Sequence, residues 1–450
     1  MASPAAMTFH PPIAAIILAA GKGTRMKSAL HKVLHPVAGR PMLLHLLASV
    51  EALQPARVVV VTGAGREQVE AAVGTRATVV VQEPQLGTGH AVAQAEAALA
   101  DFDGVVLILY GDVPLVETAT MARMVAALTD AVAAVVLGFR PADPGAYGRI
   151  LSTDGRIDKM VEFKDASDAE RTATLCNSGL MAVRSRDLWP LLARVGNANA
   201  AGEYYLPDIV GLADRPSAVI ETAAAEVAGV NSRAELAGIE AVWQTRARVA
   251  HMDNGVTLTA PDTVWFAHDT MVAADVTIEP NVVFGPGVTI ARGATIRAHS
   301  HVVGASIGED CDVGPFARLR PGTILDAGAK IGNFVETKNA HFGAGAKANH
   351  LSYLGDAEIG AKANIGAGTI TCNYDGFFKY RTTIGAGAFI GSNSALVAPV
   401  TIGAGAIVGA GTTLTADVDP DALALARSPQ TCKVGWAARF RAAMVARKRS

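Results

Sequence analysis

An apolar residue recurs every six positions through much of the second half of the chain, and this period restricts the possible folds more than any other feature. The register comprises Val272, Ile278, Phe284, Ile290, Ile296, Ile307, Val313, Leu319, Leu325, Ile331, Ile359, Ile365, Ile384, Ile390, Leu396, Ile402, Val408 and Leu414. A period of six is too long for a helix face, and it is the signature of a hexapeptide parallel β-helix, in which three hexads close one triangular coil. We therefore expect a β-helix whose periodic residues stack inward.

The count of six fails in two segments, His341–Glu358 and Asn373–Thr383. An insertion has to leave a regular coil, so we expect both segments to lie outside the coils and to carry function. The first segment places His350 and Tyr353 close together in the sequence. On its own, a histidine such as His350 is more often structural than catalytic.

The composition indicates several domains and excludes several classes of protein. A chain of 450 residues is too long for one hydrophobic core, so two or more domains are expected. The net charge of -2 gives no reason to expect nucleic acid or a membrane as a partner. The four cysteines are too scattered for a zinc site or a disulfide framework. Because the sequence has no secretion signal and no run long enough to span a membrane, we expect a cytoplasmic protein.

The first half of the chain alternates apolar runs with amphipathic segments. Apolar runs lie at 13–20, 57–62, 77–81, 105–110 and 131–139, with amphipathic segments such as 42–53 between them. This alternation predicts a doubly wound α/β sheet, in which ligands bind beyond the carboxyl ends of the strands. The rule points to two turns, Gly21–Arg25 and Gly111–Asp112.

The glycine-rich turn after the first apolar run does not fit the two commonest nucleotide motifs. A dinucleotide-binding turn is disfavoured because its third glycine position is Met26 and the next strand, Val58–Thr62, ends without an acidic residue for a ribose. The P-loop motif is also absent from this segment. The sequence leaves a phosphate-binding turn, with Lys22, Arg25 and Lys32 nearby, or a purely structural turn as the alternative.

The segment Leu18–Met26, followed by Lys32, resembles the signature of the sugar-phosphate nucleotidyltransferases. Together with the hexads, nearly the whole chain resembles the bacterial family of bifunctional enzymes that combine N-acetylglucosamine-1-phosphate uridylyltransferase with glucosamine-1-phosphate N-acetyltransferase. The resemblance implies an α/β fold with a doubly wound, Rossmann-like nucleotidyltransferase domain at 1–232, a helical linker at 233–253 and a left-handed parallel β-helix at 254–450. Apolar residues at helical spacing in the linker agree with a helix there.

By this resemblance, the first domain takes UTP and N-acetylglucosamine 1-phosphate, with Mg²⁺ as cofactor. The nucleotide and sugar-phosphate residues would be Leu18, Ala19, Ala20, Gly21, Lys32, Gln82, Gly87, Thr88, Tyr110, Gly111, Asp112, Gly148, Glu162, Asn177 and Asn231. Asp112 and Asn231 would hold the metal, and Arg25 and Lys32 would be the catalytic cations. Attack of one phosphate on another needs no base, so positioning and charge neutralisation are the main catalytic tasks. Taken singly, Asp112 could instead be a turn or cap residue and Asn231 a helix start.

The same resemblance makes the β-helix an acetyltransferase domain. His350 would be the general base that takes a proton from the glucosamine amine as it attacks acetyl-CoA, a task that suits imidazole near neutral pH. The amino-sugar phosphate would be bound by Arg320, Lys338, Tyr353 and Asn364. Acetyl-CoA would be bound by Ala367, Asn373, Tyr374, Ser392, Ala410 and Arg427. Lys433 and the basic tail are either further partners for its phosphates or a solvated end.

Two local departures from the family pattern stand beside His350. Asn349 precedes it where a glycine is common, and His341–Phe342 stands where a basic–leucine pair is often seen. Neither departure removes an expected ligand-binding residue.

Three functions remain open from the sequence. The first, which the resemblance implies, is a two-site enzyme that takes only small-molecule substrates and makes UDP-N-acetylglucosamine, a precursor of peptidoglycan and lipopolysaccharide. The resemblance also implies that this enzyme is a homotrimer. The second is nucleotidyl transfer alone, with the β-helix as an oligomerisation or regulatory module, as in ADP-glucose pyrophosphorylases. The third is a regulatory assembly protein, like subunits of a eukaryotic translation-initiation exchange factor.

Overall fold

The structure, a computed structural model, describes residues 11–21 and 23–449, and the cation predicted at Lys22 lies outside these residues. The chain forms two compact units, Met1–Arg246 and Ala247–Ser450. The boundary falls within α8 (Arg233–Asp253), which covers the segment predicted to be a linker helix.

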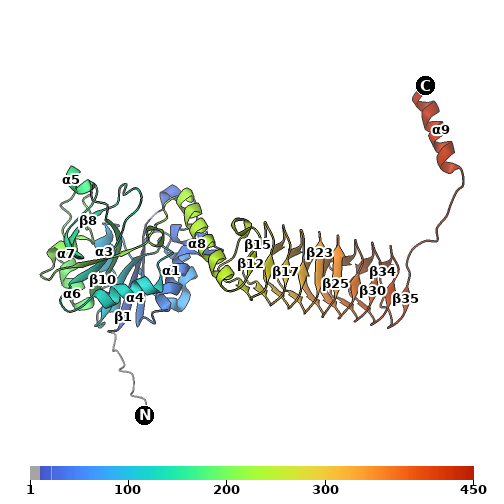
Figure 1. Cartoon of the computed structure of the whole chain (residues 1–450), viewed down its shortest axis with the longest axis horizontal. Helices are drawn as coiled ribbons and strands as arrows, with labels where there is room; N and C mark the ends of the chain where they lie inside the picture. Colours follow the sequence, from blue (N-terminus) through green and yellow to red (C-terminus); the bar gives the residue numbers. More distant parts are fainter. Residues whose placement is uncertain (1–10, 22, 450) are drawn as a thin grey trace, which may run out of the picture. The chain divides into compact units, whose positions relative to one another are not determined.

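The first unit is built on a nine-stranded mixed sheet (Figure 1). In spatial order its strands are β5 (Thr78–Val81), β4 (Arg57–Thr62), β1 (Ile13–Ala19), β6 (Val105–Tyr110), β10 (Cys176–Arg184), β7 (Ala134–Phe139), β11 (Ala218–Thr222), β9 (Arg156–Val161) and β8 (Arg149–Thr153). Strand β1 runs parallel to β4 and β6, whereas β10 is antiparallel to its neighbours β6 and β7. The carboxyl ends of β1 and β6 therefore meet at one edge, where the predicted turns begin.

Helices cover both faces of this sheet, as the doubly wound prediction requires. Alternate residues of β1 enter two separate cores, Ile17 on one face and Ile16 on the other. One face packs against α1 (Met42–Glu51), α2 (Arg66–Val73) and α4 (Thr118–Ala127). The other packs against α3 (Thr88–Ala93), α6 (Ser185–Leu192) and α7 (Asp208–Leu212), and the short α5 (Asp168–Arg171) lies near β8. A sheet buried on both faces explains why its central strands are almost wholly apolar.

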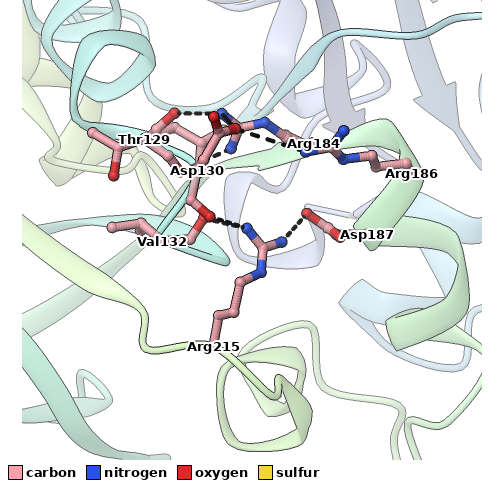
Figure 2. A network of polar contacts seen from close by, with 8 residues as sticks. Thr129, Asp130, Val132, Arg184, Arg186, Asp187 and Arg215 are labelled. Atoms are coloured by element: carbon pink, nitrogen blue, oxygen red, sulfur yellow. Dashed lines mark hydrogen bonds and ion pairs between the residues drawn. The ribbon is translucent and has the colours of Figure 1, made fainter.

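Arginine side chains fix the amino-terminal edge of the sheet, opposite the predicted ligand turns (Figure 2). Arg184, at the end of β10, donates from Nη1 to the carbonyl oxygen of Thr129 at 2.9 Å. Arg215 donates to the carbonyl oxygen of Asp130 at 2.6 Å and pairs with Asp187 in α6. These contacts hold the loop before β7 against α6, so the side chains at this edge have a structural role.

The second unit is a parallel β-helix. One sheet consists of β12 (Thr257–Leu258), β14 (Thr277–Ile278), β17 (Thr295–Ile296), β20 (Asp312–Val313), β23 (Lys330–Asn333), β25 (Lys347–His350), β27 (Asn364–Ile365), β30 (Phe389–Ile390), β33 (Ile407–Val408) and β35 (Leu423–Ala424). Fourteen further strands form the remaining surface: β13 (Met271–Val272), β15 (Val283–Phe284), β16 (Thr289–Ile290), β18 (His301–Val302), β19 (Ala305–Ile307), β21 (Arg318–Leu319), β22 (Thr323–Leu325), β24 (Glu336–Phe342), β26 (Tyr353–Ile359), β28 (Ile370–Cys372), β29 (Thr382–Ile384), β31 (Ala395–Val397), β32 (Val400–Ile402) and β34 (Thr413–Leu414). Periodic residues such as Ile278, Ile296 and Val313 pair in register and are fully buried. The six-residue period thus predicted the coil.

The two breaks in the hexad count have different structures. The prediction that His341–Glu358 leaves the coils is wrong, because His341 in β24 pairs directly with Glu358 in β26. This coil takes 17 residues, one fewer than three hexads, so the break is a shortened corner. The prediction that Asn373–Thr383 leaves the coils is confirmed for all but its last two residues, which lie in β29, since the next coil, from Glu358 to Thr383, takes 25 residues. Its extra residues form a small hairpin closed by a bridge between Tyr374 and Lys379.

The chain continues beyond the coils into α9 (Trp436–Arg449), whose side chains are all exposed. Among the helices of residues 11–21 and 23–449, none combines the length and the apolar character that crossing a membrane requires.

Candidate active sites

A cavity of about 380 Å³ opens at the carboxyl edge of the first unit's sheet. Its lining includes these residues that the resemblance predicted: Leu18, Ala19, Ala20, Gly21, Lys32, Gln82, Gly87, Thr88, Tyr110 and Asp112. Val33, Gln85, Ala91 and Glu203 line it as well and were not predicted. Segments that are distant in sequence therefore converge on one cavity of a size typical for small-molecule sites.

Lys32 is the centre of the polar contacts at the deep end of this cavity. Its ammonium forms an ion pair with the carboxylate of Asp112 and lies 3.2 Å from Oδ1 of Asn231. Asp112 and Asn231 come from segments more than a hundred residues apart, yet their oxygen atoms meet at one cation. This convergence argues against the alternatives in which each is only a cap or turn residue.

The same two oxygen atoms fit a magnesium site. Across residues 11–21 and 23–449 there is no cluster of three or more His, Cys, Asp or Glu side chains able to hold a metal. Mg²⁺ does not need one, because it is commonly bound by one or two protein oxygens together with substrate phosphates and water. Asp112 and Asn231 supply a carboxylate and an amide oxygen that converge on one point, so the donor set suits this ion.

The far end of the cavity is shaped by a glycine turn. Gln82 is buried, and its amide donates to the carbonyl oxygen of Gly87 at 2.9 Å. Gly87 has a φ of 110°, and an added Cβ would lie 2.6 Å from the carbonyl oxygen of Tyr204. Thr88 accepts a hydrogen bond from the backbone of Leu206 at 3.0 Å. A side chain at Gly87 would thus be strained and would clash, which explains the glycine.

Tyr110 connects this cavity to a second group of predicted residues. Burial raises the pKa of Tyr110, and the nearby carboxylates of Asp112 and Glu162 raise it further, so the phenol stays protonated. An added Cβ at Gly148 would lie 3.2 Å from Oε1 of Glu162, and Asn177 donates from its backbone to the carbonyl oxygen of Gly148 at 2.9 Å. Gly148, Glu162 and Asn177, all predicted to bind the sugar phosphate, therefore form one cluster.

Glu162 lies in surroundings that disfavour its charge. Burial raises its pKa, and the carboxylates of Asp165 and Asp208 add to the shift. A carboxyl group with a raised pKa accepts hydrogen bonds from neutral donors, such as sugar hydroxyls, more readily than it tolerates an adjacent phosphate. This end of the site consequently suits the sugar rather than the phosphates.

Six predicted residues of this unit are not part of the cavity lining: Arg25, Gly111, Gly148, Glu162, Asn177 and Asn231. Arg25 is exposed on a short 3-10 helix, η1 (Thr24–Met26). Gly111 donates from its backbone to the carbonyl oxygen of Leu18 at 2.9 Å and so joins the ends of β1 and β6. Gly111 is therefore a backbone connector, and Arg25 belongs to the exposed loop that precedes Lys32.

In the β-helix, His350 stands at a corner of the coil with Asn333 directly beside it. The Nδ1 atom of His350 lies 2.7 Å from Oδ1 of Asn333, and strands β23 and β25 place the two residues in register. Because an amide oxygen only accepts, Nδ1 is the donor and Nε2 is left with a free lone pair in the neutral ring. Both residues line a cavity of about 330 Å³. Asn333 was not predicted, because it lies 17 residues before the histidine and only the coil brings them together.

Three of the predicted acetyl-CoA residues continue this corner from coil to coil. Ala367, Ser392 and Ala410 each follow the second residue of β27, β30 and β33 by two positions. The backbone oxygen of Ala410 accepts a hydrogen bond from Arg427 at 2.7 Å. The oxygen of His350 accepts one from Gly368 at 3.4 Å. The structure thus places three of the residues predicted for acetyl-CoA in one column with the predicted base, and Arg427 is hydrogen-bonded to the last of them.

A cluster of three cations occupies the next corner of the same coils. Lys338 in β24 lies beside Lys379 and Arg320, and the pKa of Lys338 is lowered first by the side chain of Lys379 and then by the charge of Arg320. Arg320 also donates to Glu336 at 2.8 Å. Like charges in one place indicate an anionic ligand. Lys379 was not predicted, because it is distant from Lys338 in the sequence and only the hairpin brings the two side chains together.

The remaining predicted residues divide between these two corners. Tyr353 and Asn373 both pack over Gly355, where an added Cβ would lie 2.4 Å from the Tyr353 hydroxyl and 2.9 Å from Nδ2 of Asn373. Tyr374 is exposed on the hairpin. Asn364 instead lies in the other sheet, paired with Lys347. Asn364 and Lys338 therefore belong to different sheets of the β-helix.

Comparison with known proteins agrees with both units. The model of the MobA-like NTP transferase domain matches residues 15–202, and the model of the bacterial transferase hexapeptide, with six repeats, matches residues 381–416. These matches confirm the predicted fold, a nucleotidyltransferase domain followed by a left-handed β-helix of hexapeptide repeats.

Curated relatives match along almost the whole chain. A protein of Rhizorhabdus wittichii is 69% identical over 444 residues, which cover 97% of this chain and 98% of the relative. Proteins of Sphingopyxis alaskensis and Zymomonas mobilis are 65% and 58% identical, cover 97% of this chain, and are themselves covered to 98% and 99%. Each of the three is named bifunctional protein GlmU. The chain therefore belongs to the GlmU family of bifunctional proteins.

Proposed function

We propose that this chain makes UDP-N-acetylglucosamine in two steps, with one step on each unit. Residues 254–450 transfer an acetyl group from acetyl-CoA to glucosamine 1-phosphate, and residues 1–232 then transfer a uridylyl group from UTP to the product. Residues 233–253 link the two domains. The observation that carries the proposal is that each unit has its own convergent site, one around Lys32 and Asp112 and one around His350.

In the uridylyl transfer, a phosphate oxygen of N-acetylglucosamine 1-phosphate attacks the α-phosphorus of UTP. The new P–O bond forms as the bond to the β-phosphate oxygen breaks and pyrophosphate leaves, so no proton has to be removed. Asp112 and Asn231 would hold Mg²⁺, which when bound neutralises phosphate charge and aligns both substrates. Lys32 and Arg25 neutralise the charge that builds up in the transition state. The glycine turn at Gly87 and the amide of Gln82 orient the uracil ring of UTP.

In the acetyl transfer, the free amine of glucosamine 1-phosphate attacks the thioester carbonyl of acetyl-CoA. Nε2 of His350 takes the amine proton, while Asn333 holds the proton on Nδ1. The C–N bond forms, the C–S bond breaks and coenzyme A leaves. The sugar phosphate pairs with Arg320, Lys338 and Lys379, and the column of corner residues lies along acetyl-CoA.

The assembly and the setting belong to the same proposal. The active form is a homotrimer in the cytoplasm, and it feeds cell-wall precursors. A site completed by a second copy is supported by the position of Asn364, which lies in a different sheet from the cation cluster of its own chain. Size-exclusion chromatography with light scattering tests this part, and a monomer that retained full acetyl transfer would contradict it.

Two assays on the same preparation test the reactions. One follows thiol release from acetyl-CoA with glucosamine 1-phosphate, and the other follows pyrophosphate release from UTP with N-acetylglucosamine 1-phosphate. Both should be positive, His350→Ala should abolish only thiol release, and Asp112→Ala should abolish only pyrophosphate release. Pyrophosphate release without thiol release would favour nucleotidyl transfer alone. If the wild-type protein gave neither signal, the proposed enzymatic function would be rejected.

A further inference from the structure

The loop that carries Arg25 leads directly into Lys32, and little of it is buried. Most residues between Gly23 and Leu30 are exposed, and Met26 is the fully buried one. Left-handed backbone at Gly23 (φ 59°) and Lys27 (φ 48°) brackets η1. Packing alone therefore does not determine the conformation of this loop, and polar contacts from neighbouring elements become important.

One such contact comes from Gln68 in α2. Its Oε1 accepts a hydrogen bond from the backbone of His31 at 2.8 Å, and its Nε2 donates to the carbonyl oxygen of Ala29 at 3.1 Å. A single amide thus fixes the peptide groups on both sides of Leu30. Lys32 directly follows His31, so Gln68 fixes the backbone that leads into the catalytic lysine.

The side chain of His31 adds to this anchor without adding charge. It is buried, and an added Cβ at Gly65 would lie 3.0 Å from its ring. Burial lowers the pKa of His31, and the charges of Lys32 and His35 lower it further, so the ring is neutral near pH 7. The uncharged ring of His31 therefore packs against Gly65 and holds the backbone next to Lys32 in place.

The second contact comes from Arg233, the first residue of α8. Its Nε donates to the carbonyl oxygen of Met26 at 3.3 Å, and its Nη1 donates to Nδ1 of His35 at 3.1 Å. Met26 directly follows Arg25, and Arg233 stands two residues after Asn231. The carboxylate of Glu235 accepts hydrogen bonds from the backbone of Asn231 at 2.5 Å and of Ser232 at 2.9 Å, and so fixes the segment from which Arg233 extends.

We propose that Gln68 and Arg233 are positioning residues for nucleotidyl transfer, which hold the loop from opposite ends so that Arg25 and Lys32 are placed against the reacting phosphates. The inference rests on the uridylyl transfer proposed above. Neither residue is among those that line the cavity, so neither is expected to contact the substrate. Their loss should therefore reduce the rate of the chemical step more than substrate binding, because a small displacement of a catalytic group has a large effect on rate.

The experiment uses the full-length chain with Gln68→Leu and Arg233→Lys. The first variant removes both amide hydrogen bonds at similar volume, and the second keeps the positive charge but loses the fork that reaches two acceptors. Glu70→Gln is the matched control, since Glu70 lies in the same helix, pairs with Arg66 on the helix surface and does not line the cavity. For each protein, kcat and KM for UTP, the rate of acetyl transfer and the melting temperature are measured.

We expect kcat for pyrophosphate release to fall about tenfold in both variants, while KM for UTP changes less than about threefold and acetyl transfer stays at the wild-type rate. The control should match the wild type in every measurement. Variants with wild-type kcat, or variants that lose acetyl transfer and melting temperature in parallel with kcat, would overturn the inference. Wild-type protein that released no pyrophosphate would instead reject the proposed function itself.

Discussion

Asn333→Ala tests whether the contact between Asn333 and His350 sets the state of the proposed base. In the structure the amide oxygen of Asn333 lies 2.7 Å from Nδ1 of His350, and this contact favours the tautomer whose Nε2 is free to accept a proton. His350 is exposed and Asn333 half-buried, so the hydrogen bond should contribute about 0.5–1.5 kcal/mol. If the whole contribution acts on the population of the productive tautomer, acetyl transfer should slow by between about twofold and twelvefold.

The assay is thiol release at saturating acetyl-CoA, with kcat and KM measured separately. The effect should appear in kcat, because Asn333 orients the base and is not expected to bind either substrate. Pyrophosphate release by the same preparation should be unchanged, and Asn254→Ala, an exposed asparagine of the same unit, should behave as the wild type. A rate within experimental error of the wild type would refute the tautomer argument, and a loss of a thousandfold or more would show that Asn333 does more than orient the ring.

Three further predictions follow from the described contacts. Lys379→Gln should raise KM for glucosamine 1-phosphate about tenfold with little change for acetyl-CoA, since one of three clustered cations is lost; steady-state kinetics check this, and an unchanged KM would remove Lys379 from the phosphate site. Lys32→Gln should lower kcat for pyrophosphate release by about a hundredfold, equivalent to roughly 3 kcal/mol, without affecting thiol release. Burial lowers the pKa of His341, but its contacts with Asp326 and Glu358 outweigh burial and raise the pKa above its ordinary value. The stabilisation that these two contacts give the fold is therefore complete below about pH 6.5, and it is lost as the pH rises through the folded-state pKa. His341→Gln should thus lower the melting temperature by a few degrees at pH 5.5 and by less at pH 9. Because the side chain is one-third exposed, the loss of stability should be at most about 1 kcal/mol. A difference in melting temperature that did not depend on pH would contradict this prediction.

Much of the fold could be predicted because its signals are periodic. Each coil repeats the same demand for an inward apolar residue, as at Ile278 and Ile296, so single irregularities do not hide the pattern. The alternation of apolar strands and amphipathic helices did the same for the first unit. The error at His341–Glu358 arose because a lost residue and an inserted residue interrupt a count of six equally. Only the pairing of His341 with Glu358 distinguishes a tight corner from an excursion.

The candidate sites divide in the same way between local and distant signals. Residues within compact motifs, such as Gly21 and Thr88, could be assigned by resemblance because their neighbours in sequence identify them. Asn333 and Lys379 have no such neighbours: the first reaches His350 only through the stacking of coils, and the second reaches Lys338 only through the hairpin. Gln68 is an exposed glutamine on an amphipathic helix, and its sequence gives no sign of its two backbone partners.

The corner of the β-helix that carries Ala367, Ser392 and Ala410 repeats at the spacing between neighbouring strands, about 4.8 Å per coil. If acetyl-CoA lies along this column, as proposed, the number of coils beyond His350 limits how long an extended acyl carrier can be while it keeps every contact. Removing one whole coil would then preserve the inward stacking and shorten the column by one strand spacing. Carrier length could therefore be changed in this architecture by adding or deleting units, with the reacting end left untouched.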